Sequence, residues 1–522
     1  MSARTWPGRV GRVVTGAAVL LLTAGVVLGA DRLPTAALVD GAPAVVEVAP
    51  PRSTLVCAGP LILPDDTGAG DSAFDPTPVE PVARVDALTA AGARGGAAAG
   101  ALTDLGTGDV ARELTPDGAA AVAGVPDPRA PLVVRAEPVD GRSARVAAVT
   151  SSVVTEGDLR GLSAATCQRP GVDLWLVGGS TALESSASLV LTNPGTTPSD
   201  VDVELWGPSG RVELAGGARQ VVAPGSERVL VLPAVAAEQR RVVVHVVASG
   251  GSVTAHLQES RLAGFTPAGT DLVVPGHVPS TRQVVAGVSV LASAVGEESQ
   301  AVLRVLAPGT EPASVRLTML GPDGVAPLPG TDALELAPGE VTDVPLGGLP
   351  AGAYTAVVDA DVPVVAAATT TRPGLPGELD DTPVLERAWS ASSVPGVGGL
   401  AALPEGVAAT TVVAAVAEGD DPAVGRPVEA VLRAFDADGG VLGEQDVTLA
   451  PGRSVAVPAA AGTTGVELVV DAEEDPDVRV AWGVVLEVGR PDGTLLSVLL
   501  PAADAPTGSQ VRVRAGTRLG LG

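Results

Sequence analysis

A repeat of about 114 residues constrains the fold of this chain more than any other feature of its sequence. Each copy opens with an alternating apolar and polar run, followed by a turn at 207–210, 321–324 or 436–439. Alternate side chains of a strand point to opposite faces, so one set in each run is predicted to be buried. These sets are Val201, Val203 and Leu205, then Val315, Leu317 and Met319, then Ala430, Leu432 and Ala434.

A second mark follows in the same order in each copy. It is the tripeptide Ala-Pro-Gly at 223–225, 337–339 and 450–452. Proline pre-sets a turn and glycine accepts positive φ, so each tripeptide is predicted to be a hairpin turn. The next strand carries Leu230, Val344 or Val457 at the aligned place. The two marks together predict three units of one fold.

The composition of these units indicates an all-β fold. Short alternating strands, with a turn about every 8–12 residues, predict tandem immunoglobulin-like β-sandwiches. Gly352-Ala353-Tyr354 is similar to the strand entry that holds a tyrosine corner. The predicted boundaries are 174–280, 281–376 and 377–503, with a linker at 374–381 and a C-terminal tail at 504–522.

Residues 31–173 are expected to form a different, β-rich N-terminal domain. Strands are predicted around 45–48, 55–57, 133–135 and 147–149. Between them, an Ala/Gly/Asp-rich tract at 65–124 is interpreted as a loop-rich insertion. A helix at 83–94, stopped by Gly95-Gly96, is predicted inside this tract.

The N-terminus has the pattern of a membrane segment. Arg4, Arg9 and Arg12 precede an apolar run at 13–30. We therefore predict a cytoplasmic basic tail at 1–12, a transmembrane anchor at 13–30 and an extracellular location for the rest. An anchor is favoured over a cleaved signal peptide because the residues before Ala30 lack the Ala-x-Ala pattern.

Cys57 and Cys167 are the only cysteines, and both follow the apolar run. A disulfide between them is predicted because exported proteins fold in oxidising compartments. Two free buried thiols and half of a metal site are the alternatives. Zinc is poorly supported because the chain has no Cys-x-x-Cys motif and only three histidines.

No residue pattern in the chain predicts catalysis or cofactor binding. The net charge of −27 and the absence of lysine argue against nucleic-acid binding and exclude a P-loop. His245 and His256 are assigned to adjacent strands and His277 to a linker, with structural roles. The acidic segments 418–421, 436–439 and 473–477 are interpreted as solvated turns, with a weak calcium site as the alternative. No catalytic, cofactor or metal residue is predicted.

Tryptophan is the residue type expected in a glycan-binding surface, because sugar faces stack on aromatic rings. The candidates after the apolar run are Trp175, Trp206, Trp389 and Trp482. Trp206 aligns with Leu320 and Phe435, which favours a structural role. Trp175 is predicted to pack in a core or between domains.

Three segments of the chain resemble a known family. They are 167–179 (Cys-Gln-Arg-Pro-Gly-Val-Asp-Leu-Trp-Leu-Val-Gly-Gly), 189–195 (Leu-Val-Leu-Thr-Asn-Pro-Gly) and 57–60 (Cys-Ala-Gly-Pro). That family is a set of membrane-anchored, secreted actinobacterial proteins of unknown function. The resemblance implies an exported β protein and supplies no activity.

These observations predict a non-enzymatic, membrane-tethered extracellular protein of the cell envelope. It is expected to act as a scaffold or binding module for an envelope protein or a wall component. An accessory subunit of envelope glycan assembly or export is the alternative. An extracellular hydrolase has almost no residue-level support, and the sequence identifies no small-molecule substrate.

Overall fold

The computed structural model describes residues 8–30, 44–47, 50–64, 70–92, 95–331, 333–377, 381–396, 398–419, 421–470, 478–502 and 510–513. The chain divides into two units, one of residues 1–49 and 508–522 and one of residues 50–507. In the first unit, helix α1 (Gly8–Ala30) contains the predicted anchor, and β1 (Ala44–Glu47) pairs antiparallel with β35 (Gln510–Val513). Across the described residues, no helix has both the length and the apolar character needed to cross a membrane.

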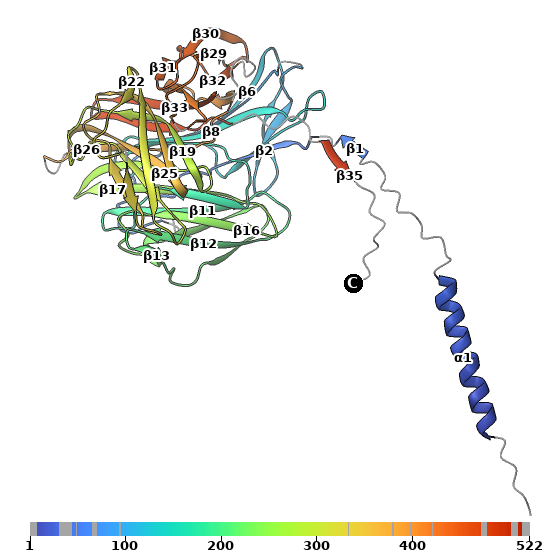
Figure 1. Cartoon of the computed structure of the whole chain (residues 1–522). Helices are drawn as coiled ribbons and strands as arrows, with labels where there is room; N and C mark the ends of the chain where they lie inside the picture. Colours follow the sequence, from blue (N-terminus) through green and yellow to red (C-terminus); the bar gives the residue numbers. More distant parts are fainter. Residues whose placement is uncertain are drawn as a thin grey trace, which may run out of the picture. The chain divides into compact units, whose positions relative to one another are not determined.

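The described part of the second unit is built from β-strands (Figure 1). Their antiparallel sheets group into four β-sandwiches, and in the third the two layers are joined through one long strand. The first contains β2 (Ser53–Cys57), β3 (Val82–Ala90), β4 (Gly100–Asp104), β5 (Val110–Leu114), β6 (Ala120–Pro126), β7 (Leu132–Ala136), β8 (Arg145–Val154) and β9 (Gly161–Thr166). Its sheets have the orders β2-β7-β4-β5 and β6-β3-β8-β9.

The second sandwich contains β10 (Asp173–Val177), β11 (Ser185–Asn193), β12 (Ser199–Gly207), β13 (Gly210–Val212), β14 (Arg219–Val222), β15 (Ser226–Val231), β16 (Val243–Ser249), β17 (Thr254–Ala263) and β18 (Thr266–Val273). A single helical turn, α2 (Leu232–Val235), follows β15. The sheets are β10-β16-β12-β13, with β14 also on β12, and β15-β11-β17-β18.

The third sandwich contains β19 (Ser280–Val290), β20 (Val302–Leu306), β21 (Ala313–Gly321), β22 (Gly324–Ala326), β23 (Leu334–Leu336), β24 (Thr342–Pro345), β25 (Gly352–Pro376) and β26 (Pro383–Ala391). The long strand β25 serves both sheets. Its first part pairs with β19 and β21, and its second part pairs with β20 and β26.

The fourth sandwich contains β27 (Gly398–Ala402), β28 (Ala408–Ala417), β29 (Val428–Phe435), β30 (Val441–Leu449), β31 (Ser454–Pro458), β32 (Gly465–Val470), β33 (Val478–Arg490) and β34 (Gly493–Leu499). Its orders are β27-β32-β29-β30 and β31-β28-β33-β34. With the strands of each sandwich numbered by position, and the two parts of β25 counted as sixth and seventh, all four sandwiches share the orders 1-6-3-4 and 5-2-7-8.

The predicted strand faces are confirmed in the first two copies. Leu205 and Met319 lie in the apolar cores of the second and third sandwiches, and the matched turns close the β12–β13 and β21–β22 hairpins. In the third copy, Ala434 is only half-buried. Phe435 is buried instead, beside a register shift in which the additional residue, Leu442, lies on the partner strand β30.

The Ala-Pro-Gly segments have the predicted backbone but not the predicted partners. Gly225, Gly339 and Gly452 have φ of 60°, 73° and 82°, in the region that favours glycine. Each segment leads from a strand of one sheet to a strand of the facing sheet, as from β14 to β15. They are therefore inter-sheet turns rather than hairpins.

The prediction of a helix within a loop-rich insertion at 65–124 is wrong. Residues 82–90 form the central strand β3, and β4, β5 and the start of β6 also lie in this tract. The N-terminal region is thus a fourth copy of the same sandwich. Its inter-sheet turn is Thr115-Pro116-Asp117-Gly118, in which Gly118 has φ of 102°.

The boundary between the third and fourth sandwiches also differs from the prediction. The segment 374–381 was expected to be a linker, but β26 pairs with β25, so it connects two strands of one sheet. Residues 378–380 lie outside the described residues. Residues 383–391 therefore belong to the third sandwich.

One immunoglobulin-like detail is present. The Tyr354 hydroxyl donates a hydrogen bond to the Pro350 carbonyl oxygen at 2.9 Å, which is the contact of a tyrosine corner. However, the sheet orders 1-6-3-4 and 5-2-7-8 are not the A-B-E-D and C-F-G orders of an immunoglobulin constant domain. The sandwich prediction is confirmed, and its immunoglobulin-like part is not.

Apolar contacts connect the four sandwiches in a closed circuit. Leu272 of the second packs with Leu61 and Phe74 of the first, and Trp389 of the third joins the core of the second. The third meets the fourth through Val357 and Ala414. The circuit closes where residues of β3, β8 and β9 join the core of the fourth sandwich.

The last strand of each sandwich lies at a sheet edge, and these four edges meet inside the circuit. Edge strands expose unpaired N–H groups, which must find acceptors when they are buried. The Leu162 N–H donates to Glu386 Oε1 at 3.0 Å, and the Trp389 N–H donates to Asp271 Oδ2 at 2.8 Å. Ser497 Oγ lies 2.9 Å from Asp271 Oδ1. Buried side chains thus bridge the edges of all four sandwiches.

These buried carboxyl groups predict a loss of stability at alkaline pH. Burial raises the pKa of Asp271 to about 8 and raises the pKa of Glu386 well above its usual value. A raised pKa favours the protonated folded state, so the contribution of these two groups to stability is fully present below about pH 4 and is lost as the pH rises through 8. We expect the free energy of unfolding to fall by about 3 kcal/mol between pH 6 and pH 9.

Thermal and urea unfolding at the two pH values measure this loss. Glu386→Gln should reduce it, because the amide oxygen can still accept the Leu162 N–H without ionising. Glu429→Gln, at an exposed position, should keep the wild-type response. If Glu386→Gln loses as much unfolding free energy between the two pH values as the wild type, then ionisation of Glu386 does not contribute to the loss.

Candidate ligand-binding groove between the second and third sandwiches

An open groove of about 540 Å³ lies between the second and third sandwiches. This volume falls within the range of small-molecule sites. The lining from the second sandwich is Trp175, Glu204, Trp206 and His245, and the lining from the third is Pro308, Gly309, Thr310, Glu311, Val362 and Pro363.

Strand register brings the first wall together. Trp175 on β10 lies opposite His245 on β16, which lies opposite Glu204 on β12. The adjacent residues Val244 and Val246 are in the core, so these three side chains point to the outer face of the sheet. Trp206 joins the same face because it follows Glu204 by two residues.

The aromatic rings form a continuous stack. The ring centroids of Trp175 and His245 are 3.9 Å apart with 14° between the planes, and those of Trp175 and Trp206 are 5.4 Å apart. The guanidinium of Arg211 lies 6.0 Å from the Trp206 centroid. Protein groups therefore occupy most of the ring faces, which agrees with exposures of only 6% for both tryptophans.

Carboxylates hold the imidazole of His245 on both sides. Its Nδ1 lies 3.1 Å from Glu204 Oε2, and its Nε2 lies 2.8 Å from Asp173 Oδ1. Glu204 also accepts a hydrogen bond from Arg211. The result is a fixed, acidic wall whose accessible polar atoms are mainly carboxylate oxygens.

The predicted packing roles of the tryptophans are confirmed. Trp175 and Trp206 are buried on the outer face of the second sandwich, in an apolar cluster that continues into the third sandwich and includes Trp389. Trp482 lies in the cluster of the fourth sandwich. The sequence did not predict the groove, because its second wall comes from the β20–β21 loop and β25 of another sandwich. The sequence of the β20–β21 loop does not indicate which residues of another sandwich this loop will face.

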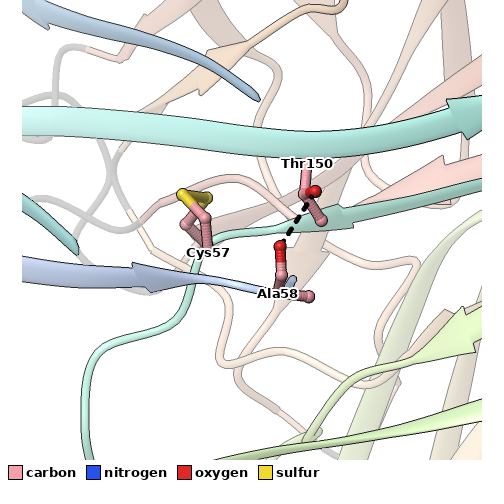
Figure 2. The surroundings of a disulfide bond; sticks show 4 residues. Cys57, Ala58 and Thr150 are labelled. Atoms are coloured by element: carbon pink, nitrogen blue, oxygen red, sulfur yellow. Dashed lines mark hydrogen bonds between the residues drawn. A yellow bond between two sulfur atoms is a disulfide. The ribbon is translucent and has the colours of Figure 1, made fainter. Parts of the chain in front are cut away.

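The predicted disulfide is confirmed. Cys57 at the end of β2 is bonded to Cys167, with a Cα–Cα distance of 4.3 Å, and the bond joins the two sheets of the first sandwich (Figure 2). Beside it, the Thr150 hydroxyl donates to the Ala58 carbonyl oxygen at 3.2 Å.

His245 and His256 lie on consecutive strands, as predicted, but these strands do not pair with each other. His245 is on β16 and His256 is on β17, in facing sheets, and their core neighbours show that the two side chains point away from each other. Burial lowers the pKa of His256 to about 4 and lowers the pKa of His277. These positions agree with structural roles.

The acidic turns accept hydrogen bonds from their own backbone. Asp436 Oδ1 accepts the N–H groups of Asp438 and Gly440 at 3.0 and 2.8 Å, and Asp421 Oδ1 accepts the Ala423 N–H at 2.9 Å. Asp420 and the segment 473–477 lie outside the described residues. Within the part of the chain that the structure describes, no group of three potential ligands is placed to hold a metal ion.

The fold and groove define a class of all-β proteins built from repeated eight-position sandwiches. The model described as "Family of unknown function (DUF5719)" matches residues 119–460, which is more than half of the chain. The chain therefore belongs to this family. The matched region begins in the first sandwich and ends in the fourth.

Other comparisons add little. No curated protein matches the chain. The crystal structure of Thermotoga maritima 1070 is 19% identical, covers 22% of this chain and 93% of its own, and has a TM-score of 0.17. The BSP domain of a biofilm associated protein is 8% identical, covers 91% of this chain and 100% of its own, and has a TM-score of 0.14.

Proposed function

We propose that this protein is an exported, non-enzymatic binding protein of the cell envelope. We further propose that the groove between the second and third sandwiches holds a segment of a neutral wall polysaccharide. The observation that carries this proposal is the groove itself, with one acidic, aromatic wall fixed by strand pairing and a second wall of apolar and polar residues from the β20–β21 loop and β25.

The Cys57–Cys167 bond supports export, because disulfides persist in oxidising compartments. The basic and apolar N-terminal segment supports it independently. The proposed tether is the run at 13–30, and its support is the sequence pattern. N-terminal sequencing of protein recovered from the envelope tests the tether, which requires residues 1–30 to be retained.

The chemistry of the groove supports a neutral, hydroxyl-rich ligand. Glu204 and Glu311 supply carboxylate oxygens that accept hydrogen bonds from hydroxyl groups, and Thr310 supplies a hydroxyl that can donate and accept. Pro308 and Val362 offer apolar surface to the C–H face of a sugar ring. The carboxylates would repel an anionic polymer at this site.

Gly309 allows the groove to be filled without disturbing the fold. A Cβ built on Gly309 meets no atom within 4 Å. We expect Gly309→Trp to reduce retention of the full-length protein by protein-free wall polysaccharide at least ~10-fold, because the indole would occupy the ligand volume. Co-sedimentation measures the retained fraction.

Gly489→Trp is the matched control, since Gly489 also has open space around its Cβ but lies on β33 in the fourth sandwich. It should bind like the wild type. Equal retention of the wild type and Gly309→Trp would exclude the groove as the site. If the wild type is not retained but co-purifies with an envelope enzyme from solubilised membranes, the accessory-subunit alternative is favoured instead.

A further inference from the structure

A second cavity, of about 290 Å³, lies elsewhere in the joint between the second and third sandwiches. Its lining is mainly polar and includes four arginines. Arg240 and Arg261 come from the second sandwich, and Arg304 and Arg387 come from the third. The hydrogen bonds of the lining residues show which of these charges are already compensated.

Arg304 is fully engaged by the protein. Its guanidinium donates to both carboxylate oxygens of Asp343, at 2.8 and 3.1 Å, and to the Gly179 carbonyl oxygen at 2.6 Å. Glu259, the buried carboxylate nearby, accepts a hydrogen bond from the Trp389 indole N–H. Asp343 is thus bonded to Arg304 and Glu259 to Trp389, and neither carboxylate is hydrogen-bonded to the Nε of Arg261 or Arg387.

Arg261 and Arg387 are not compensated. The Nε atom of each is buried and has no hydrogen-bond partner. Neither side chain makes a hydrogen bond or an ion pair with the described residues. An unpaired buried guanidinium N–H is costly, because it has lost its water without gaining an acceptor.

Both arginines are held in place by the backbone. Arg261 lies where the register of β17 against β18 shifts, between Ser260 and Leu262, and such bulges redirect side chains. Arg387 on β26 lies against Gly269 of β18, where an ideal Cβ would come within 2.6 Å of the Arg387 nitrogen. The close approach of these strands therefore depends on glycine at 269.

Carboxylates also line this cavity, from Glu259, Glu297, Glu298 and Asp343, but none of them is hydrogen-bonded to the Nε of Arg261 or Arg387. Burial, together with the positive charges of Arg261 and Arg304, lowers the pKa of Arg387 to about 10. Glu259 and Glu298 oppose this effect without cancelling it. Two guanidinium groups that repel each other in a partly enclosed cavity would both be stabilised by a bound anion.

We propose that this cavity is an anion-binding site in which Arg261 and Arg387 together hold a carboxylate or phosphate group. The planar guanidinium presents N–H donors that match the oxygen spacing of both groups. The cavity fits a small anion or the charged end of a larger ligand. This site is separate from the groove proposed above and takes an anionic ligand, whereas the groove is proposed to take a neutral one.

Thermal unfolding of the full-length protein in sodium phosphate, sodium sulfate or sodium acetate tests the proposal, against sodium chloride at equal ionic strength. We expect the midpoint to rise by about 2–5 °C in phosphate, acetate or both, because the anion binds only the folded state. Comparison of the unfolding midpoints in the three salts shows which oxyanion is preferred. Titration calorimetry with inorganic phosphate and with acetate measures binding directly.

Arg261→Gln and Arg387→Gln should both lose this response, whereas Arg219→Gln, at an exposed arginine on β14, should keep it. Gly309→Trp should also keep it, which separates this site from the groove. Equal midpoints in all salts would overturn the proposal, as would wild-type responses in both arginine variants. A large loss of stability in Glu298→Gln would also overturn it, because Glu298 would then be the counterion.

Discussion

Leu205→Ala is expected to lower the free energy of unfolding of the second sandwich by about 2–5 kcal/mol. Leu205 is fully buried on β12, in a core that both sheets of this sandwich share. Truncation removes apolar contacts and leaves a cavity that the paired strands cannot close. Met319→Ala, at the matched position of β21, should have a similar effect on the third sandwich.

Urea denaturation followed by tryptophan fluorescence measures the first effect, because Trp175 and Trp206 pack in the same core cluster. Asp202→Ala is the matched control on the same strand. Its side chain is 52% exposed and lies 3.7 Å from Arg219, so the change should be within about 0.5 kcal/mol. Equal effects of the two substitutions would show that the strand faces are wrongly assigned.

Loss of the Cys57–Cys167 bond should destabilise the first sandwich by about 4–5 kcal/mol in the chain-entropy model. The bond closes a long loop, with a sequence separation of 110 residues, and joins the two sheets of this sandwich. The change to make is Cys57→Ala with Cys167→Ala. The other sandwiches should be less affected, because their sheets contain no part of this crosslink.

Hydrogen exchange of peptides from β2 and β7 measures this effect, because the tryptophans that the structure places lie in other sandwiches. Thr150→Val is the control beside the bond. It removes only the hydrogen bond to Ala58, so the loss should be about 1 kcal/mol. Exchange as slow in the double variant as in the wild type would mean that the noncovalent contacts suffice.

Much of the fold followed from local patterns in the sequence. The alternation at 201–206 and 315–320 correctly predicted both the strands and their buried faces, because it depends only on the two-residue period of a strand. The glycines after Ala-Pro correctly predicted positive φ. The only two cysteines correctly predicted their bond. The strand faces and the glycine turns are decided by a few neighbouring residues. The disulfide follows because two cysteines can pair in only one way.

The first sandwich was missed because its marks are altered. Its turn after β4 lacks the Gly-Pro-x-Gly pattern of the second and third sandwiches, and an aspartate separates Pro116 from Gly118. The Ala-rich sequence of β3 is compatible with a helix when it is considered alone. It forms a strand because β6 and β8 pair with it on both sides.

The candidate sites depend on contacts that the sequence does not encode locally. The groove requires β10, β12 and β16 to pair in register and a loop of the third sandwich to face them. The proposed anion site requires Arg261 and Arg387, which are far apart in the chain, to line one cavity in which neither Nε atom has a hydrogen-bond partner. The sequence by itself determined the strands at 201–206 and 315–320, the backbone of the Ala-Pro-Gly turns and the disulfide. Short-range geometry decides the strands and turns, and two cysteines can pair in only one way. The tertiary structure alone decided which sheets face each other and which charges stay uncompensated, because burial and hydrogen-bond partners come from residues distant in the chain.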